Sequence, residues 1–144
     1  MYFDKFAQQG NVFLKEVAFK LGDEEERGRA LRVTRAVFHA LRGRISITES
    51  LQLLAQLPLY LKAIYVDGWK VRPDDQRIRH MDDFLALVRR EAGTTADNDF
   101  WNEWEVFGAS SAVISVMRQH VSDGEIEDIK RTLPEELHEL FEGE

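Results

Sequence analysis

The sequence predicts an all-α protein in which two tandem repeats of about four helices each pack into one helical-bundle domain. Apolar residues recur at spacings of three, four and seven along the longer segments, which is the pattern of amphipathic helices. Two Ser-x-x-Glu motifs indicate the starts of shorter helices. Residues 36–65 also align with residues 112–141 at a shift of 76 positions, without a gap.

The repeat defines the expected organisation of a single domain, residues 1–144. The first copy covers about residues 3–66, a linker about residues 67–79, and the second copy about residues 80–142. Each copy alone would expose much of its apolar surface, so we expect the copies to pack together. The identical residues at matching positions are Ala36 and Ala112, Val37 and Val113, Arg42 and Arg118, Ser46 and Ser122, Glu49 and Glu125, Leu57 and Leu133, Pro58 and Pro134, and Leu61 and Leu137.

The composition is typical of a soluble globular protein. The chain has 144 residues, 44% of them hydrophobic, which is enough to bury a core. It has no cysteine, which excludes a disulfide framework, a thiolate metal site and a thiol nucleophile. The first residues lack the apolar segment of a signal peptide, and no apolar run reaches the roughly 20 residues that span a bilayer. We therefore expect a cytoplasmic protein with no membrane partner.

Charge is distributed unevenly along the chain. The net charge is −7, but residues 1–72 hold 12 Lys and Arg against 8 Asp and Glu, whereas residues 73–144 hold 7 against 18. Such a division predicts either two oppositely charged faces or halves that attract each other. It argues against a dedicated nucleic-acid-binding protein, which is normally basic overall.

A first helix is predicted over residues 2–20. Gly22 suits the left-handed position that follows a helix, and Asp23 is the expected N-cap of the next helix. The apolar stripe of the first helix comprises Phe3, Phe6, Phe13, Leu14, Val17 and Leu21.

The second helix, predicted over residues 24–42, has two different faces. With 100° of rotation per residue, one face of this helix is polar and lies opposite the apolar face. It holds Arg32, Arg35, His39 and Arg42. A face of this kind is most often solvated, and the alternative is a surface that binds an anion or a phosphate backbone. The apolar face comprises Ala30, Val33, Thr34, Val37, Phe38 and Leu41.

Each repeat then contains a capping box, formed by Ser46 and Glu49 in the first copy and by Ser122 and Glu125 in the second. The serine oxygen is expected to accept the N3 backbone N–H, and the glutamate to bond back to the N–H of the cap residue. Each short helix should end at a Leu-Pro pair, after which another short helix begins. Serine and glutamate can also perform catalysis, but a structural cap explains both residue types at this spacing.

The linker is expected to be irregular, because Asp67-Gly68 is a turn signal and Pro73 disfavours a helix just before it. Trp69 is expected to pack over the joint between the repeats, with ligand stacking as the alternative.

The helical pattern of the first helix returns at residues 84–93, at an offset of 71, so about five residues are inserted before the next helix. Residues 99–118 are predicted to form that long helix. Trp101 lies off its stripe and should be exposed or cover the seam between the repeats. The stripe, expected in the core, comprises Phe100, Trp104, Phe107, Ser111 and Ile114.

No catalytic or cofactor motif is present. The sequence lacks a glycine-rich phosphate loop, HExxH, GxSxG and an EF-hand pattern. The histidines have no convincing metal-ligand spacing. We therefore assign no catalytic residue, metal site or cofactor, and an enzyme is the least favoured class.

The segment Leu41-Arg42-Gly43-Arg44-Ile45-Ser46, with Glu49, Gln56-Leu57-Pro58 and Gly68-Trp69, resembles a bacterial family known as domain of unknown function 2267. The second copy, with Val121-Ser122, Gly124-Glu125 and Leu133-Pro134, fits the same pattern. The similarity covers about residues 13–141. It implies a small, soluble, all-helical prokaryotic protein, and it brings no established activity or functional residue.

Two functions remain open. The first is a protein-interaction or scaffold module whose partner is another protein or a second copy, with an exposed apolar patch around Trp69 and Trp101. The second is weak nucleic-acid or anion binding through the basic residues Arg32, Arg35, Arg42 and Arg44.

Overall fold

The computed structural model describes residues 2–143, so the terminal residues of the predicted domain, 1 and 144, lie outside it. The prediction of an all-α fold is confirmed, because the described residues contain helices and no strand. The helices are α1 (Tyr2–Lys20), α2 (Arg27–Arg44), α3 (Ile47–Leu54), α4 (Leu59–Val66), α5 (Met81–Ala92), α6 (Ala96–Asp99), α7 (Glu103–His120) and α8 (Asp123–Thr132), with 3₁₀ helices η1 (Pro73–Arg77), η2 (Gly93–Thr95) and η3 (Glu135–Phe141).

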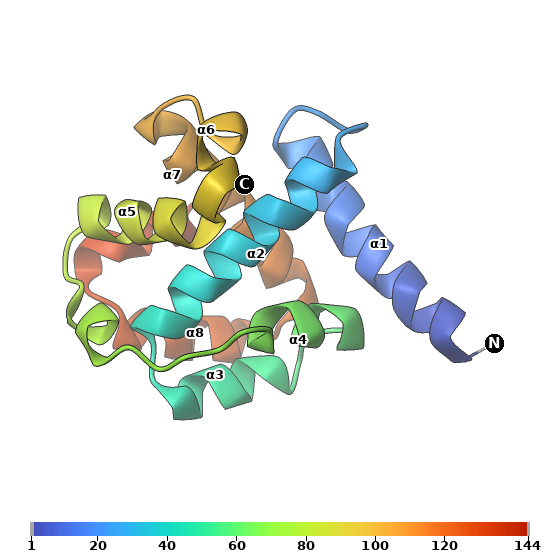
Figure 1. Cartoon of the computed structure of the whole chain (residues 1–144). Helices are drawn as coiled ribbons and strands as arrows, with labels where there is room; N and C mark the ends of the chain where they lie inside the picture. Colours follow the sequence, from blue (N-terminus) through green and yellow to red (C-terminus); the bar gives the residue numbers. More distant parts are fainter. Residues whose placement is uncertain (1, 144) are drawn as a thin grey trace.

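Helix α2 runs through the middle of the bundle (Figure 1). It contacts α1, α4, α5, α7 and η1, so most of the chain packs directly against it. On one side of the bundle α3 packs against α8, joining the two halves of the sequence. No helix in the described range is both long and apolar enough to cross a bilayer.

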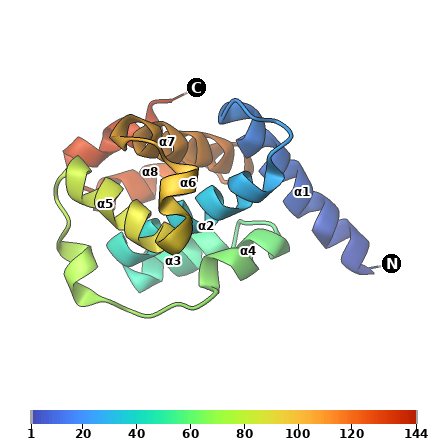
Figure 2. The same ribbon diagram turned by 45° about the horizontal axis from the view of Figure 1, so that its top comes forward.

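Helix α1 follows the predicted stripe only in part. Its second half supplies core residues, but Phe3 is 73% exposed, because the N-terminal end of α1 projects away from the bundle in both views (Figure 2). Gly10 marks the close approach of α1 to α4, since a Cβ atom there would lie 2.6 Å from Cδ1 of Tyr60. The buried residues of α1 are Phe13, Leu14, Val17 and Ala18.

The turn from α1 to α2 differs from the prediction in one respect. Gly22 has a φ of 82°, the left-handed conformation that glycine adopts without strain. Asp23, however, is not the N-cap of the next helix. Glu26 occupies that position and accepts a hydrogen bond from Arg29 N at 3.3 Å, so α2 spans 27–44 rather than 24–42.

Serines begin both short helices of the repeated pattern. Ser46 Oγ accepts the N–H of Glu49 at 3.1 Å at the start of α3, and Ser122 Oγ accepts the N–H of Glu125 at 3.2 Å at the start of α8. The return bond of a capping box is absent at Ser122, whose N–H donates instead to Gln56 Oε1 at 2.7 Å. The glutamates are therefore free for a different contact.

The predicted core stripe of residues 99–118 is wrong at Trp104, which is 83% exposed. Asn102 caps α7 by accepting the N–H of Glu105 at 3.0 Å, so the helix begins four residues later than expected. Phe100 is buried in the segment before α7 and does not share its helical phase. The buried residues of α7 are Val106, Ala109, Ser110, Ala112, Val113, Ile114, Ser115, Val116 and Met117.

Matching positions of the two copies make one contact in common. Arg42 donates through Nη1 to the carbonyl oxygens of Tyr65 and Asp67, both at 2.7 Å. Arg118 donates through Nη1 to the carbonyl oxygens of Phe141, at 2.5 Å, and Gly143, at 3.3 Å. Each of these residues lies 76 positions after its counterpart. The two-repeat organisation remains our interpretation, and it explains this pairing.

The caps generate a prediction for stability. Replacing Ser46 or Ser122 by alanine should each lower the free energy of unfolding by about 1 kcal/mol, because one backbone N–H at the start of a helix loses its acceptor. Urea denaturation measures the change. Thr48→Ala is the control, since Thr48 is exposed in the first turn of α3. A loss at Thr48 equal to that at Ser46 would contradict the assignment.

Candidate functional site

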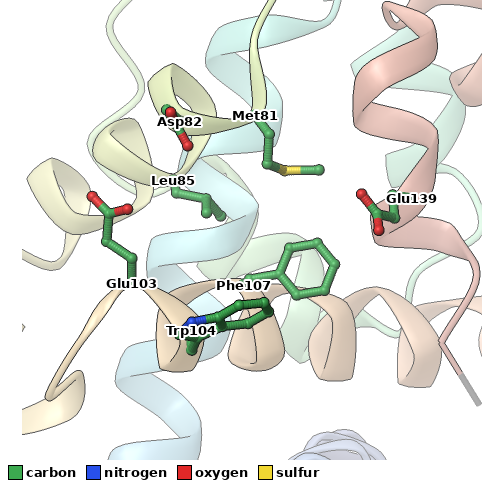
Figure 3. Close-up of a pocket in the computed structure, with 7 residues that line it drawn as sticks. All are labelled: Met81, Asp82, Leu85, Glu103, Trp104, Phe107 and Glu139. Atoms are coloured by element: carbon green, nitrogen blue, oxygen red, sulfur yellow. The ribbon is translucent and has the colours of Figure 1, made fainter.

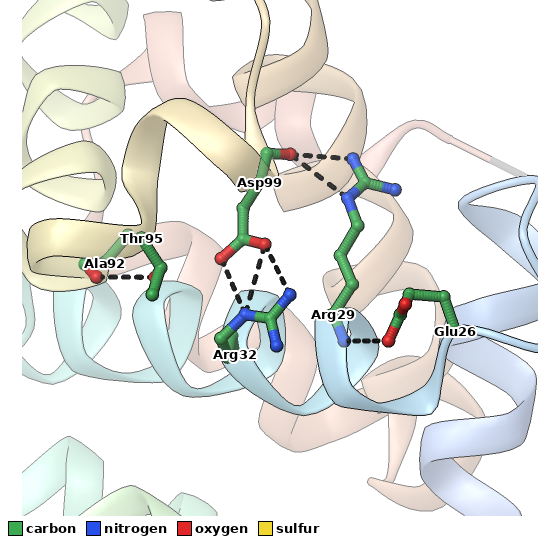
Figure 4. A network of polar contacts seen from close by, with 6 residues as sticks. All are labelled: Glu26, Arg29, Arg32, Ala92, Thr95 and Asp99. Carbon is green, nitrogen blue, oxygen red and sulfur yellow. Dashed lines mark hydrogen bonds and ion pairs between the residues drawn. The ribbon is translucent and has the colours of Figure 1, made fainter.

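The basic face predicted on α2 is not free for a ligand. Arg32 Nη2 lies 2.8 Å from Oδ1 of Asp99, and its Nε donates to the same carboxylate (Figure 4). Arg29 donates to the backbone oxygen of Asp99 at 2.8 Å. The hydrogen bond to Asp99 raises the pKa of Arg32, and the side chain of Asp99 is almost completely buried. Asp99, the last residue of α6, thus supplies the acceptor for these two arginines.

The remaining arginines of the predicted surface are also engaged. Arg35 pairs with Asp67 at 2.9 Å. Contrary to the prediction, Arg42 and Arg44 are buried, and Arg44 Nε donates to the backbone oxygen of Ile78 at 2.7 Å. Burial lowers the pKa of both guanidinium groups, which nevertheless stay protonated in proteins. Through these contacts with Asp67 and Ile78, Arg35 and Arg44 hold the segment between α4 and α5 against α2.

Trp69 belongs to the same structural cluster. Its ring meets that of Tyr65 edge-on with centroids 5.8 Å apart, and the guanidinium carbon of Arg42 lies 5.7 Å from the Trp69 ring centroid. Trp69 is thus half-buried against two residues of the first copy, and its packing over the joint between the repeats stays a prediction.

Two tryptophans at the start of α7 are highly exposed. Trp101 is 82% exposed and Trp104 is 83% exposed. Because most soluble proteins keep such large rings covered, a pair of exposed tryptophans marks a candidate binding surface. The sequence predicted Trp101 as a surface residue and placed Trp104 in the core.

Trp104 forms one wall of an open groove of about 350 Å³ between α5, α7 and η3 (Figure 3). Met81, Leu85 and Phe107 provide the apolar part of its lining. Three carboxylates complete the lining, with Asp82 and Glu103 toward one end and Glu139 toward the other. The groove therefore combines an aromatic, apolar floor with an acidic rim.

A second unusual feature is the buried pair formed by Glu49 and Glu125, at the contact between α3 and α8. The two residues are 8% and 6% exposed, and the Oε2 atom of each lacks a hydrogen-bond partner when both are ionised. A proton on one carboxyl group provides the missing donor, and the other carboxylate accepts it. The glutamates of the two capping motifs thus meet each other.

Burial and the neighbouring charge of Glu49 raise the pKa of Glu125 to about 7, and Asp128 on the same helix adds to the effect. The hydroxyl of Tyr65, from α4, is held at 2.6 Å by Ser50 Oγ, and burial raises the pKa of Tyr65. Within the described chain no three acidic, histidine or cysteine side chains are placed to hold a metal ion. The pair is therefore suited to share a proton.

The sequence contained signals for features of the site that the prediction missed. Matching positions of an internal repeat can meet at its symmetry centre, so the alignment of Glu49 with Glu125 could have suggested the pair. The exposure of Trp104 also had a signal, because Asn102 and Glu105 have the spacing of a helix N-cap, and a helix starting at residue 103 interrupts the predicted stripe.

Comparison with known proteins gives a family and no activity. The model of the family DUF2267, described as an uncharacterized conserved protein, matches residues 10–140. No curated protein matches the chain.

The carboxylate pair predicts a pH dependence of stability. The pKa of Glu125 is higher in the folded state than in the unfolded state, so its contribution is complete below the unfolded pKa, near pH 4.5, and is lost as pH rises through about 7. In Glu125→Gln, the amide donates to Glu49 at every pH. The melting temperature of the wild type should therefore fall relative to that of Glu125→Gln between about pH 5 and pH 8.

Taking the difference in melting temperature between the wild type and Glu125→Gln cancels the contribution of other titrating groups. His39, whose pKa is lowered by burial, shifts stability in the opposite direction, but it is present in both. Glu127→Gln, an exposed change on α8, is the control and should show no such trend. A difference between wild type and Glu125→Gln that stays constant with pH would contradict the shared proton.

Proposed function

The chain belongs to DUF2267, a family of uncharacterized conserved proteins, and we propose that it acts as a protein-interaction module. The observation that carries the proposal is the exposure of Trp101 and Trp104, each more than four-fifths accessible and only three positions apart in the sequence. Tryptophan is enriched among the residues that dominate binding energy at protein interfaces. A cytoplasmic location, favoured by the lack of cysteine, is part of the same proposal.

The shape of the surface supports a protein partner. The groove beside Trp104 is apolar at its floor and polar at its rim, which is the usual anatomy of an interface. Burying one exposed tryptophan removes on the order of 200 Å² from water, worth several kcal/mol before the costs of association. Two such rings are enough to anchor a modest interface.

Nucleic-acid binding is the less supported alternative. It was based on Arg32, Arg35, Arg42 and Arg44, and the first two form ion pairs while the other two are buried against backbone carbonyls. The existing bonds occupy part of the five N–H donors of each guanidinium and partly neutralise Arg32 and Arg35, so these side chains attract a phosphate less strongly. The chain also carries a net charge of −7, which repels a polyanion.

Capture from lysate tests the interaction module. The wild-type chain should retain a defined set of proteins that Trp101→Ala combined with Trp104→Ala loses, because the two rings provide most of the apolar contact area. Phe19→Ala is the matched control, since Phe19 is 66% exposed on α1 and lies outside the surface. The control should retain the same proteins as the wild type.

Two outcomes would contradict the proposal. If the double tryptophan variant retained the same proteins, Trp101 and Trp104 would not form the binding surface. Retention of nucleic acid by the wild type, released as salt increases, would favour the alternative function.

A further inference from the structure

The groove beside Trp104 carries negative charge that the rest of the protein does not neutralise. Asp82, Glu103 and Glu139 line it, and no Lys, Arg or His belongs to its lining. In the described part of the chain none of the three carboxylates makes an ion pair or a side-chain hydrogen bond. Asp99, Asp75 and Asp67, by contrast, each bind an arginine. The groove thus holds three unpaired charges at an apolar surface.

Local helix structure explains only part of this charge. Asp82 lies in the first turn of α5 and Glu103 in the first turn of α7, where a carboxylate is favoured by the helix dipole. Glu139 lies in the last turn of η3, where the dipole disfavours a carboxylate. Glu139 is exposed and lines the same groove as the other two carboxylates, so the three charges together attract a cationic ligand.

The floor of the groove suits the rest of such a ligand. Trp104 offers the face of an indole ring, the aromatic group that attracts cations most strongly. Met81, Leu85 and Phe107 are partly or fully buried and surround the space beside it, so the aliphatic stem of a long basic side chain would remain in apolar contact. Methionine adapts its shape to different partners at little cost.

We propose that this groove docks a segment of another protein that presents a lysine or arginine flanked by apolar residues. The inference rests on the proposed function and adds the chemistry of the partner. The cation lies over Trp104 and among the three carboxylates, and the flanking apolar side chains cover Met81 and Phe107. An acidic segment or a nucleic acid is repelled by the same rim.

Labelled peptides test the proposal on the full chain. One short peptide carries a single lysine between leucines, and two others carry glutamate or glutamine in its place. Fluorescence anisotropy at low salt should show the lysine peptide binding roughly tenfold or more tightly than the glutamate peptide, with the glutamine peptide between them. Trp104→Ala should weaken the binding of the lysine peptide, because the ring contributes apolar and cation–π contact.

Two sets of charge-neutralising variants distinguish the effect of the groove carboxylates from the effect of the protein's net charge. The combination Asp82→Asn, Glu103→Gln and Glu139→Gln should abolish the preference for lysine. The control combination Asp23→Asn, Glu24→Gln and Glu25→Gln makes the same change in net charge at exposed residues between α1 and α2, and it should keep the preference. Circular dichroism checks that all variants are folded.

Three results would overturn the proposal. They are equal binding of the lysine and glutamate peptides, a lysine preference that survives in the groove variant, and self-association of the chain that the groove variant abolishes. The last would assign the groove to a second copy, whose exposed segment 70–72 contains Lys70, Val71 and Arg72. If capture depends on the tryptophans while the peptides show no preference, the interaction module stands and only the cationic partner is lost.

Discussion

The hydrogen bonds that the arginines of α2 donate to distant parts of the chain determine much of this structure. A guanidinium removed from water must find acceptors, because an unpaired buried charge costs several kcal/mol. Arg42 and Arg44 meet this requirement at backbone oxygens of the end of α4 and of the segment before α5, and the buried carboxylate of Asp99 meets it at Arg32. Each bond joins α2 to a segment that is distant in the sequence. The same bonds engage the arginines that the sequence had suggested as an anion-binding face.

The sequence predicted the fold well because apolar periodicity and helix caps are local properties. Ser46 and Ser122 begin helices through contacts only three residues away, and Gly22 ends one through its own backbone conformation. The fate of Arg42 depends instead on how many elements surround α2. A helical projection gives the direction of a side chain, but not the depth of structure that covers it. Other helices flank α2 on several sides (Figure 2), so even its polar face is partly buried.

Two features of the candidate sites show the limits of local patterns. Glu49 and Glu125 were predicted to complete capping boxes, yet the packing of α3 on α8 brings them together, and the N–H of Ser122 donates to Gln56 instead. Trp104 was assigned to the core because it falls on a stripe that includes Phe100. Once α7 begins at Glu103, that stripe is interrupted and the ring faces solvent. For the glutamates, the deciding feature is the contact between α3 and α8, which the capping pattern does not contain. For Trp104, it is the residue at which α7 begins.

The measurement that tests the central claim most directly is fluorescence quenching of Trp104 as the only tryptophan, in a variant with Trp69→Phe and Trp101→Phe. The claim is that Trp104 is open to solvent and surrounded by unpaired carboxylates. It predicts red-shifted emission. Each ion's quenching constant is divided by its value for free N-acetyltryptophanamide, and at low salt this ratio should be higher for caesium than for iodide, because the rim attracts cations and repels anions. Blue-shifted emission that neither ion quenches, or a higher ratio for iodide, would contradict the account.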